Sequence, residues 1–322
     1  MNILSIFEPI REELELVEER LREAVEIEHS YLKHILSYLL DSGGKRIRPA
    51  LVILASKFHD SDADRVLPLA ASVELLHTAT LVHDDLLDGS FLRRGNPTLN
   101  ASLSAEVVVL VGDYLFARAA DLAAATSSVP IVSIFAQTLM IICNGELRHA
   151  LTKSDWRSTK EDYFQSIYSK TASLFAASTE AGALLSGAAA PTVEALRAYG
   201  HNLGMAFQIL DDILDFTGDE KELGKPIGSD LRQGTVTLPL LVFLEAHPEI
   251  DILSSIFDEP EGREEKIRAL VDMVRNSVAI ASARDEAERF TAASKRAIQN
   301  LPPNEYRQAM LHLADYLLER RT

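Results

Sequence analysis

Apolar residues recur along this chain with the period of an α-helix, and alternating strand patterns do not. Near the start, Ile10, Leu14, Val17, Leu21 and Ala24 are four and three residues apart, which places them on one helical face. Similar stripes predict further helices at residues 67–88, 105–125, 131–151, 159–187, 193–216, 267–283 and 304–321. The breaks between them, at 42–44, 89–97, 188–191 and 218–234, are short. None separates two cores, so we predict one large all-α domain over residues 1–322.

Composition agrees with a helical globular protein. Hydrophobic residues make up 47% of the 322 residues, and the 15 glycines and 12 prolines are few. A formal net charge of −16 argues against nucleic acid or an anionic membrane as the main partner. Cys143 is the one cysteine, which excludes an internal disulfide and suits a reducing cytoplasm. The first residues lack the basic start of a signal peptide.

One stretch is long enough to span a bilayer. Residues 122–145 are 24 residues without a charge. The stretch contains several polar side chains and is split by Pro130. We therefore predict a helix buried on most sides rather than a transmembrane span.

Two acidic clusters end long apolar stripes, each just before a loop that contains glycine. Their members are Asp84, Asp85 and Asp88 in the first cluster, and Asp211, Asp212 and Asp215 in the second. Carboxylates four residues apart on a helix differ by about 40° in azimuth and about 6 Å in rise, so they share a face. The C-terminal end of a helix disfavours negative charge, and carboxylates on one face repel each other. Such a cluster therefore requires a cation. Carboxylate oxygens are ligands typical of Mg²⁺, which also bridges to substrate phosphates.

Two simpler interpretations are less favoured. Solvated helix ends would explain one cluster better than two, and calcium lacks a loop of EF-hand spacing. Helical spacing also places His77 within about 20° of the azimuth of Asp84, and it places Gln208 on the face of the second cluster.

Cations gather in the breaks and near the acidic clusters. Segment 43–49 combines two glycines with Lys45, Arg46 and Arg48 at the head of a helix, which is chemistry for a diphosphate. The other candidates are Arg93 and Arg94 after the first cluster, Lys170 with Thr171 in mid-helix, and Lys225 in the loop 218–234. The four glycines of that loop suit a mobile lid.

These motifs together resemble the trans-type isoprenyl diphosphate synthases, the polyprenyl synthetase family, over nearly the whole chain. They are GGKRIRP (43–49), ELLHTATLVHDDLLD (74–88), RRGNPT (93–98), GDYLFARA (112–119), KTASLF (170–175), GMAFQILDDILDFTGD (204–219) and LGKPIGSDLRQGTVTLP (223–239). The resemblance implies a bundle of long helices around a central cavity, of isoprenoid synthase type, usually as a homodimer. It also implies a cytoplasmic, Mg²⁺-dependent prenyltransferase of isoprenoid biosynthesis that condenses isopentenyl diphosphate with an allylic diphosphate. Peripheral membrane contact for product release stays open.

The resemblance also implies roles for individual residues. Mg²⁺ would be held by Asp84, Asp88, Asp211 and Asp215, with Asp85 and Asp212 assisting in catalysis. The allylic diphosphate would meet Arg93, Lys170, Gln208 and Lys225, and isopentenyl diphosphate would meet Lys45, Arg48, His77 and Arg94. The Thr171 oxygen and Phe207 are candidate partners of the developing allylic cation. One departure is Thr235, which stands where the family usually has a second lid lysine.

Product length depends on the residues below the first cluster. Short-chain members of the family often carry an aromatic residue five positions before the first aspartate, where this chain has Ala79. Together with Thr80 this small residue favours a long all-trans product of about C30 to C50, as in octaprenyl-type synthases. Val73 has nearly the azimuth of Asp84 and Phe135 lies on the uncharged helix, so both are candidate length-setting residues.

The alternatives are a geranylgeranyl-length synthase, a class I terpene cyclase, a metal phosphohydrolase and a non-catalytic helical subunit of a heteromeric prenyl synthase. The symmetric second cluster and the basic segment 43–49 argue against a cyclase or a phosphohydrolase, and the six retained aspartates argue against a non-catalytic subunit.

Overall fold

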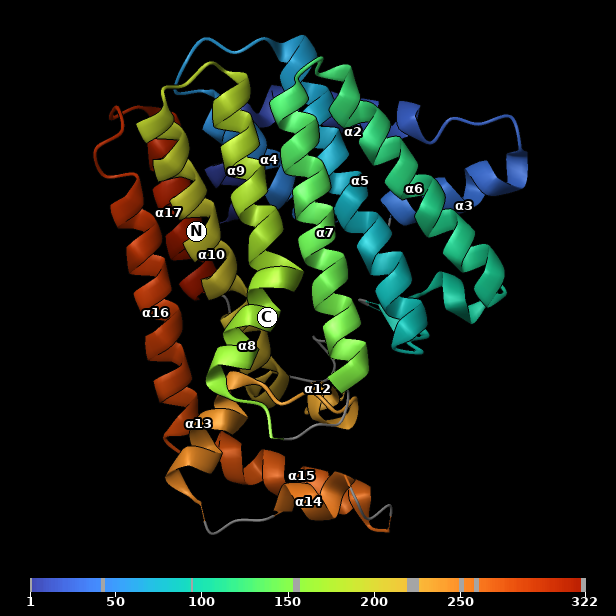
Figure 1. Cartoon of the computed structure of the whole chain (residues 1–322), viewed down its shortest axis with the longest axis vertical. Coiled ribbons are helices and arrows are strands. Elements are labelled where there is room, and N and C mark those ends of the chain that lie inside the picture. The colour runs from blue at the N-terminus through green and yellow to red at the C-terminus, as the bar shows by residue number, and fades with distance from the viewer. Residues whose placement is uncertain are drawn as a thin grey trace. The chain divides into compact units, whose positions relative to one another are not determined.

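The protein is built almost wholly from helices (Figure 1). The computed structural model describes residues 2–41, 44–93, 95–152, 157–218, 226–248, 252–257 and 261–319. The longer helices are α2 (Arg11–Ala24), α3 (Ser30–Asp41), α4 (Ile47–Ser56), α5 (Ala63–Leu87), α6 (Ala105–Ala125), α7 (Val129–Thr152), α8 (Lys160–Ile167), α9 (Ser173–Leu185), α10 (Ala190–Thr217), α13 (Leu238–Ala246), α15 (Arg263–Arg275), α16 (Ala279–Ala297) and α17 (Glu305–Glu319). The predicted all-α class is confirmed.

Short elements complete the described chain. They are α1 (Ile3–Ile6), η1 (Glu8–Ile10), β1 (Leu92–Arg93), β2 (Asn96–Pro97), η2 (Leu99–Ala101), the π-helical turn η3 (Tyr168–Ala172), α12 (Ser229–Arg232) and α14 (Ile252–Phe257). β1 and β2 pair antiparallel in a hairpin, with Leu92 opposite Pro97 and Arg93 opposite Asn96.

The chain forms two compact units that interleave along the sequence. The first unit contains Met1–Leu139, Leu174–Gly200 and Arg296–Leu313, and the second contains Met140–Ser173, His201–Lys295 and Ala314–Thr322. The prediction of a single domain stays a prediction, and each unit is described by itself below.

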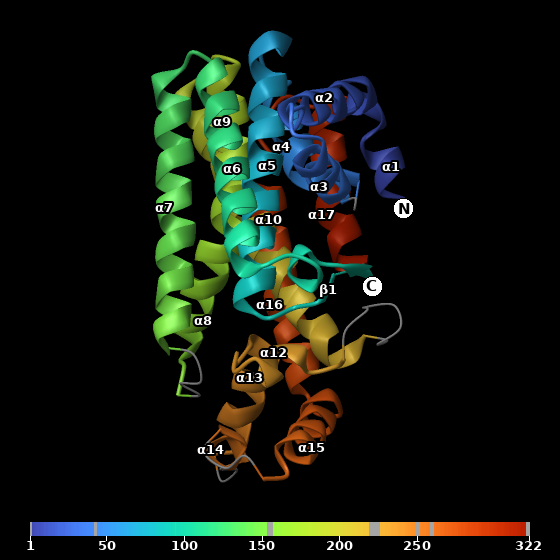
Figure 2. The same cartoon turned by 90° about the vertical axis from the view of Figure 1, so that its right-hand side faces the viewer.

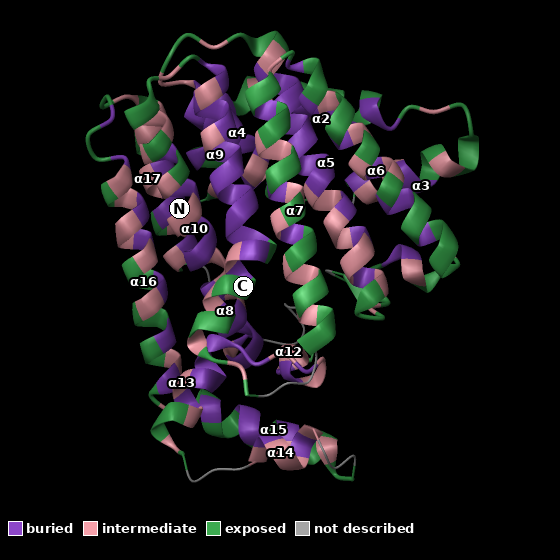
Figure 3. Ribbon diagram, in the orientation of Figure 1, coloured by how far each residue is buried: buried purple, intermediate pink, exposed green. Residues whose placement is uncertain are grey.

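In the first unit, α5 packs against α6, α4 and α2 (Figure 2). Asp62 caps its start, because the Asp62 carboxylate accepts the backbone N–H of Asp64 at 3.0 Å. From Val66 to Leu76 every residue of α5 is buried, as Figure 3 illustrates, whereas its last turns are partly exposed. The buried start anchors the helix, and the exposed end presents the first acidic cluster.

In the second unit, α13 packs against both α8 and α15, and α14 packs against α15. The start of α8 is held by a capping box in which Thr159 and Asp162 exchange hydrogen bonds. Aromatic rings join α8 to α16, since Phe164 lies 5.9 Å from Phe290 between ring centroids. α8 is therefore fixed both at its start and along one face.

The uncharged helix is much less buried than predicted. By length and composition alone, two helices of the described chain, α5 and α7, could cross a membrane. The most apolar window of α5 is 72% buried, but that of α7 is only 17% buried. Val129, Met140, Leu147 and Leu151 of α7 are exposed, so the prediction of a helix buried on most sides is wrong. An absence of charge could not distinguish a core helix from one with an open apolar face.

Two predicted helices are also interrupted. The segment predicted at 267–283 is split between α15 and α16, with Asn276 capping the end of α15. The segment predicted at 159–187 contains the π-helical turn η3, which widens the helix by one residue around Lys170. In both places the apolar period continues through the irregularity, so sequence periodicity could not detect it.

Candidate active site

The first acidic cluster lies on the last turn of α5, in the first unit. Asp84 is half-buried and Asp88 is exposed, and they lie one turn apart because the Asp88 N–H donates to the Asp84 carbonyl at 2.9 Å. Asp85 is buried instead, and the Arg93 Nε–H lies 2.9 and 3.0 Å from its two carboxylate oxygens. Asp84 and Asp88 are thus the less buried aspartates of this cluster.

The Asp85–Arg93 pair ties the hairpin to the helix. Burial raises the pKa of the Asp85 carboxyl above its usual value, and the Arg93 guanidinium offsets part of this rise. The hairpin is held further by the Thr98 hydroxyl, which donates to the Ser90 carbonyl at 2.6 Å. Arg93, a predicted diphosphate contact, is therefore paired with an aspartate in this structure, and the predicted Arg94 lies outside the described residues.

The three cations of segment 43–49 separate into two kinds. Arg46 has a left-handed backbone, with φ 48°, and caps the start of α4. Its guanidinium pairs with Glu18 at 2.5 Å and Glu74 at 2.9 Å and donates to the Leu40 carbonyl at 3.0 Å. Burial lowers the pKa of Arg46, but the two glutamates more than offset this and leave it raised. Arg46 is thus committed to the fold.

Its neighbours Lys45 and Arg48 are the two residues of this segment that the family resemblance assigns to isopentenyl diphosphate. Lys45 is exposed. Arg48 is half-buried, with its guanidinium carbon 4.9 Å from the ring centroid of Phe175. The stacked ring limits the freedom of Arg48. The third candidate of this unit, His77, is half-buried on α5.

His83 locks α5 against α6 next to the first cluster. Its Nε2 lies 3.1 Å from the Val109 carbonyl oxygen, and its ring meets Phe116 edge-on at 5.3 Å. A Cβ at Gly112 would overlap the His83 ring, so only glycine permits this approach without a shift. Sequence analysis gave this pair no role, although the glycine inside a helical pattern was a visible signal.

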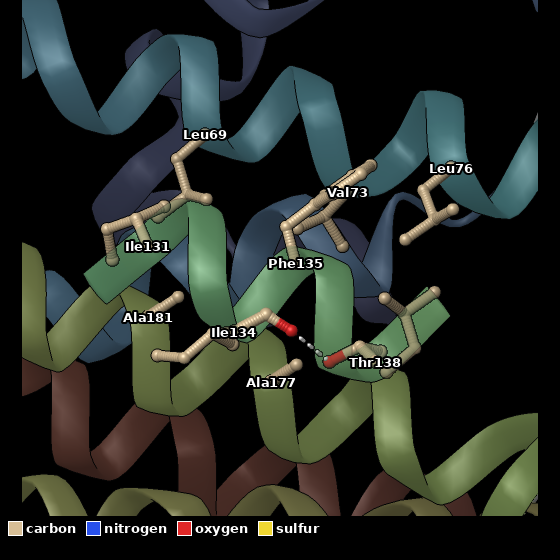
Figure 4. A pocket seen from close by; sticks show the side chains of 10 residues that line it. Leu69, Val73, Leu76, Ile131, Ile134, Phe135, Thr138, Ala177 and Ala181 are labelled. Carbon is tan, nitrogen blue, oxygen red and sulfur yellow. Dashed lines mark hydrogen bonds between the residues drawn. The ribbon is translucent and has the colours of Figure 1, made fainter. Parts of the chain in front are cut away.

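An apolar pocket lies in the same unit between α5, α7 and α9 (Figure 4). Its lining residues are Leu69, Val73, Leu76, Ile131, Ile134, Phe135, Thr138, Leu174, Ala177 and Ala181. The one hydroxyl among them, that of Thr138, donates within its own helix to the Ile134 carbonyl at 2.8 Å. The predicted length-setting residues Val73 and Phe135 both line this pocket, whereas Ala79 and Thr80 do not.

The second acidic cluster lies on α10, in the second unit, and its aspartates differ in environment. Asp211 is half-buried. Asp212 is buried, accepting the Tyr163 hydroxyl at 2.6 Å and the Gln208 amide at 2.9 Å. Burial and the Asp230 carboxyl raise the pKa of Asp212 well above its usual value, and the two hydrogen bonds offset only part of this.

Asp215 is also buried and also has protein donors on both carboxylate oxygens. The Ser229 hydroxyl donates at 2.8 Å and the Asp230 N–H at 3.1 Å, while the Gly228 N–H donates to the Asp215 carbonyl at 2.8 Å. Asp215 therefore holds the start of α12 beside the end of α10. The predicted lid residue Lys225 lies outside the described residues.

The π-helical turn η3 carries the remaining predicted residues. Lys170 is exposed, and its ammonium lies 3.2 Å from a carboxylate oxygen of Glu146. Thr171 is buried, and its hydroxyl donates to the Gln208 side-chain oxygen at 2.6 Å. Helical spacing predicted that Gln208 lies beside Asp212, and the structure adds Thr171 from a different element to this pair.

The donor chemistry fits Mg²⁺ in part. The exposed Asp88 and the half-buried Asp84 and Asp211 carry carboxylate oxygens, which are hard ligands. Among the described residues no group of three or more His, Cys, Asp or Glu side chains is close enough to hold a metal by itself. The metal assignments therefore stay predictions.

Comparison with known proteins identifies the class. Residues 29–274 match the model of the polyprenyl synthetase family. A heptaprenyl diphosphate synthase component 2 of Geobacillus stearothermophilus is 38% identical over 320 residues, covering 99% of each chain.

Two solved structures share the fold over the whole chain. A polyprenyl synthase from Caulobacter crescentus CB15, complexed with calcium and isoprenyl diphosphate, has a TM-score of 0.94 and 35% identity and covers 100% of this chain and 98% of its own. A decaprenyl diphosphate synthase from Rhodobacter capsulatus has a TM-score of 0.92 and 33% identity, with 100% of both chains covered.

The fold and the two aspartate clusters thus define an all-α isoprenoid synthase, and the protein is a prenyltransferase. The chain belongs to the polyprenyl synthetase family.

Proposed function

We propose that this protein is a long-chain trans-prenyl diphosphate synthase. It condenses isopentenyl diphosphate head-to-tail with an allylic diphosphate and makes an all-trans product of about C30 to C50. Relatives named heptaprenyl and decaprenyl diphosphate synthases support the long-chain type.

The course of α5 carries this proposal. Asp84 and Asp88 lie at its exposed end, and Leu76, Val73 and Leu69 line the apolar pocket nearer its start. Val73 is eleven residues before Asp84, so it lies about 16 Å along the axis and within about 20° in azimuth. A diphosphate held at Asp84 would direct its hydrocarbon tail down this face towards the pocket. The lining of the pocket is apolar, so it would accept the hydrocarbon end of a chain.

The chemistry follows from charge. The allylic carbon–oxygen bond breaks, and its electron pair leaves with the diphosphate. Lys170, Gln208 and the lid residue Lys225 would stabilise the charge on the leaving oxygens, with Arg93 once it exchanges Asp85 for substrate. Mg²⁺ held by Asp84, Asp88 and Asp211 would supply further electrostatic stabilisation there.

The second substrate completes the bond. Lys45, Arg48, His77 and Arg94 would hold isopentenyl diphosphate, whose double bond attacks the allylic cation. The released diphosphate accepts the proton that is then lost. Because the cation must meet the double bond before water, the surrounding surface must be apolar.

The test is incubation of the purified protein with Mg²⁺, isopentenyl diphosphate and farnesyl diphosphate, followed by mass spectrometry of the products. A ladder ending between about C30 and C50 is expected from the apolar pocket. A product that stops at geranylgeranyl length, hydrolysis alone, or a cyclic product would each contradict the proposal. Omitting the metal should abolish the ladder.

A catalytic subunit that needs a second component is the alternative function. It is supported by the word "component" in the name of the Geobacillus relative. Under this alternative the protein would be silent in the same assay until its partner is added.

We further propose that the enzyme is a homodimer and acts in the cytoplasm, where its single cysteine would stay reduced. The exposed apolar residues of α7, such as Met140 and Leu147, supply a surface that association would cover. Light scattering should give twice the chain mass of 35.5 kDa, and Leu147→Glu should shift the protein towards the monomer. A monomeric parent protein would contradict the homodimer.

A further inference from the structure

A chain of buried hydrogen bonds joins three elements of the second unit. The Tyr163 hydroxyl of α8 donates to Asp212 of α10 at 2.6 Å, and the Gln208 amide donates to the other oxygen of Asp212 at 2.9 Å. The Thr171 hydroxyl of η3 donates to the Gln208 side-chain oxygen at 2.6 Å. Tyr163, which sequence analysis did not select, begins this chain.

The network has one internally consistent direction. The NH₂ group of Gln208 donates to Asp212, and an amide nitrogen cannot accept a hydrogen bond, so the amide oxygen of Gln208 points away from Asp212. The Gln208 oxygen then faces Thr171, and this oxygen can only accept. The hydroxyl hydrogen of Thr171 is therefore directed at Gln208, and the lone pairs of the Thr171 oxygen remain for a positive charge.

Tyr163 is well placed to maintain this direction. Burial and the Asp212 carboxyl raise the pKa of Tyr163, so its hydroxyl stays protonated and donates. Its separation of 2.6 Å from Asp212 is at the short end of the range for O–H···O hydrogen bonds. The edge-on contact with Phe164, at 5.5 Å between ring centroids, helps to hold the ring in place.

We propose that Tyr163 is a positioning residue for the condensation, acting through Asp212 and Gln208 to aim the oxygen lone pairs of Thr171 at the allylic cation. Asp212 then serves as the centre of this network rather than as a metal ligand. This inference rests on the proposed function.

The structure offers a matched control for Tyr163→Phe. The Tyr199 hydroxyl is also buried and donates to the Met310 carbonyl at 2.7 Å. Tyr163 is 5% exposed and Tyr199 is 0% exposed, so each Phe substitution removes one buried donor and keeps the ring. A merely structural role for Tyr163 predicts that the two variants behave alike.

The experiment is a single-turnover measurement of the first condensation, with farnesyl diphosphate as primer. Tyr163→Phe is expected to lower the rate about tenfold while the KM of both substrates stays within about twofold, because positioning acts on the transition state. Tyr199→Phe should retain the parental rate. Equal rates for the two variants would overturn the proposal.

A double variant tests the route through Thr171. If Tyr163 acts through this hydroxyl, Tyr163→Phe with Thr171→Val should be within about twofold of Thr171→Val alone. If the double variant instead loses the product of the two single-variant factors, the route through Thr171 is overturned. If Tyr163→Phe fails to fold, the condensation rates of Thr171→Ser and Thr171→Val are compared instead. Equal rates would show that the Thr171 hydroxyl is unused and would overturn the proposal. A parental protein that makes no prenyl diphosphate refutes the proposed function, whereas an active parent with a fully active Tyr163→Phe refutes only this inference.

Discussion

Arg46 offers a quantitative test of how the basic segment is divided between fold and substrate. Its side chain is 16% exposed, and that of its partner Glu74 is 6% exposed. Arg46→Ala would leave the Glu74 carboxylate buried without its cation. Breaking a buried ion pair in this way costs about 3–5 kcal/mol, and the partly exposed second partner Glu18 favours the lower figure.

The expected loss converts into a melting temperature. An unfolding entropy of about 2.1 cal/mol/K per residue gives roughly 0.7 kcal/mol/K for 322 residues. A loss of about 3 kcal/mol therefore lowers Tm by roughly 4 °C, measured by circular dichroism. An unchanged Tm would refute the assignment of Arg46 to the fold.

Two further substitutions separate an effect on stability from an effect on substrate binding. Arg46→Gly should recover about 1 kcal/mol relative to Arg46→Ala, because glycine adopts the positive φ of this position without strain. Arg48→Ala should chiefly raise the KM for isopentenyl diphosphate. If Arg46→Ala raised that KM without loss of stability, the division of roles would be wrong.

Four other outcomes are expected. Phe135→Ala should lengthen the product by at least one C5 unit in mass spectrometry, because the next apolar layer of α7 lies about one turn, or about 5 Å, further on; an unchanged ladder would contradict this. Gly112→Ala should destabilise the protein by about 1–3 kcal/mol in urea unfolding, since the added methyl group overlaps the His83 ring. A stability equal to that of the parent would show that α6 can shift to make room for the methyl group at no cost. Burial raises the pKa of Glu180, so its ionisation costs stability as pH rises. Glu180→Gln should therefore unfold at a higher temperature than the parent at neutral pH, with the difference closing in acid; a difference independent of pH would count against it. Asp84→Ala should lower turnover by several orders of magnitude, and activity within about tenfold of the parent would count against the metal assignment.

Local spacing explains what could be predicted. The α-helical period placed α6 at 105–125, as observed, and brought α5 and α10 within a few residues of their bounds. The i, i+4 spacing of Asp84 and Asp88 likewise puts both side chains at the open end of α5. These features depend only on residues within a turn or two of each other.

The partners of the charged residues could not be predicted in the same way. Arg46 meets Glu74 from 28 residues away, and Tyr163 meets Asp212 from 49 residues away. Arg46 and Arg48 are two residues apart in one motif and look equivalent in sequence, so the pairing of Arg46 with Glu18 and Glu74 could not be predicted.

The sequence by itself thus determined the helical class, the two aspartate clusters and the family, because these follow from short-range periodicity and fixed spacing. Tertiary structure alone decided which aspartates are buried, that Arg46 pairs with a buried glutamate and that α7 has an open apolar face. The burial and pairing of a side chain depend on elements distant in sequence, so the sequence of a single helix does not show which other elements pack against it.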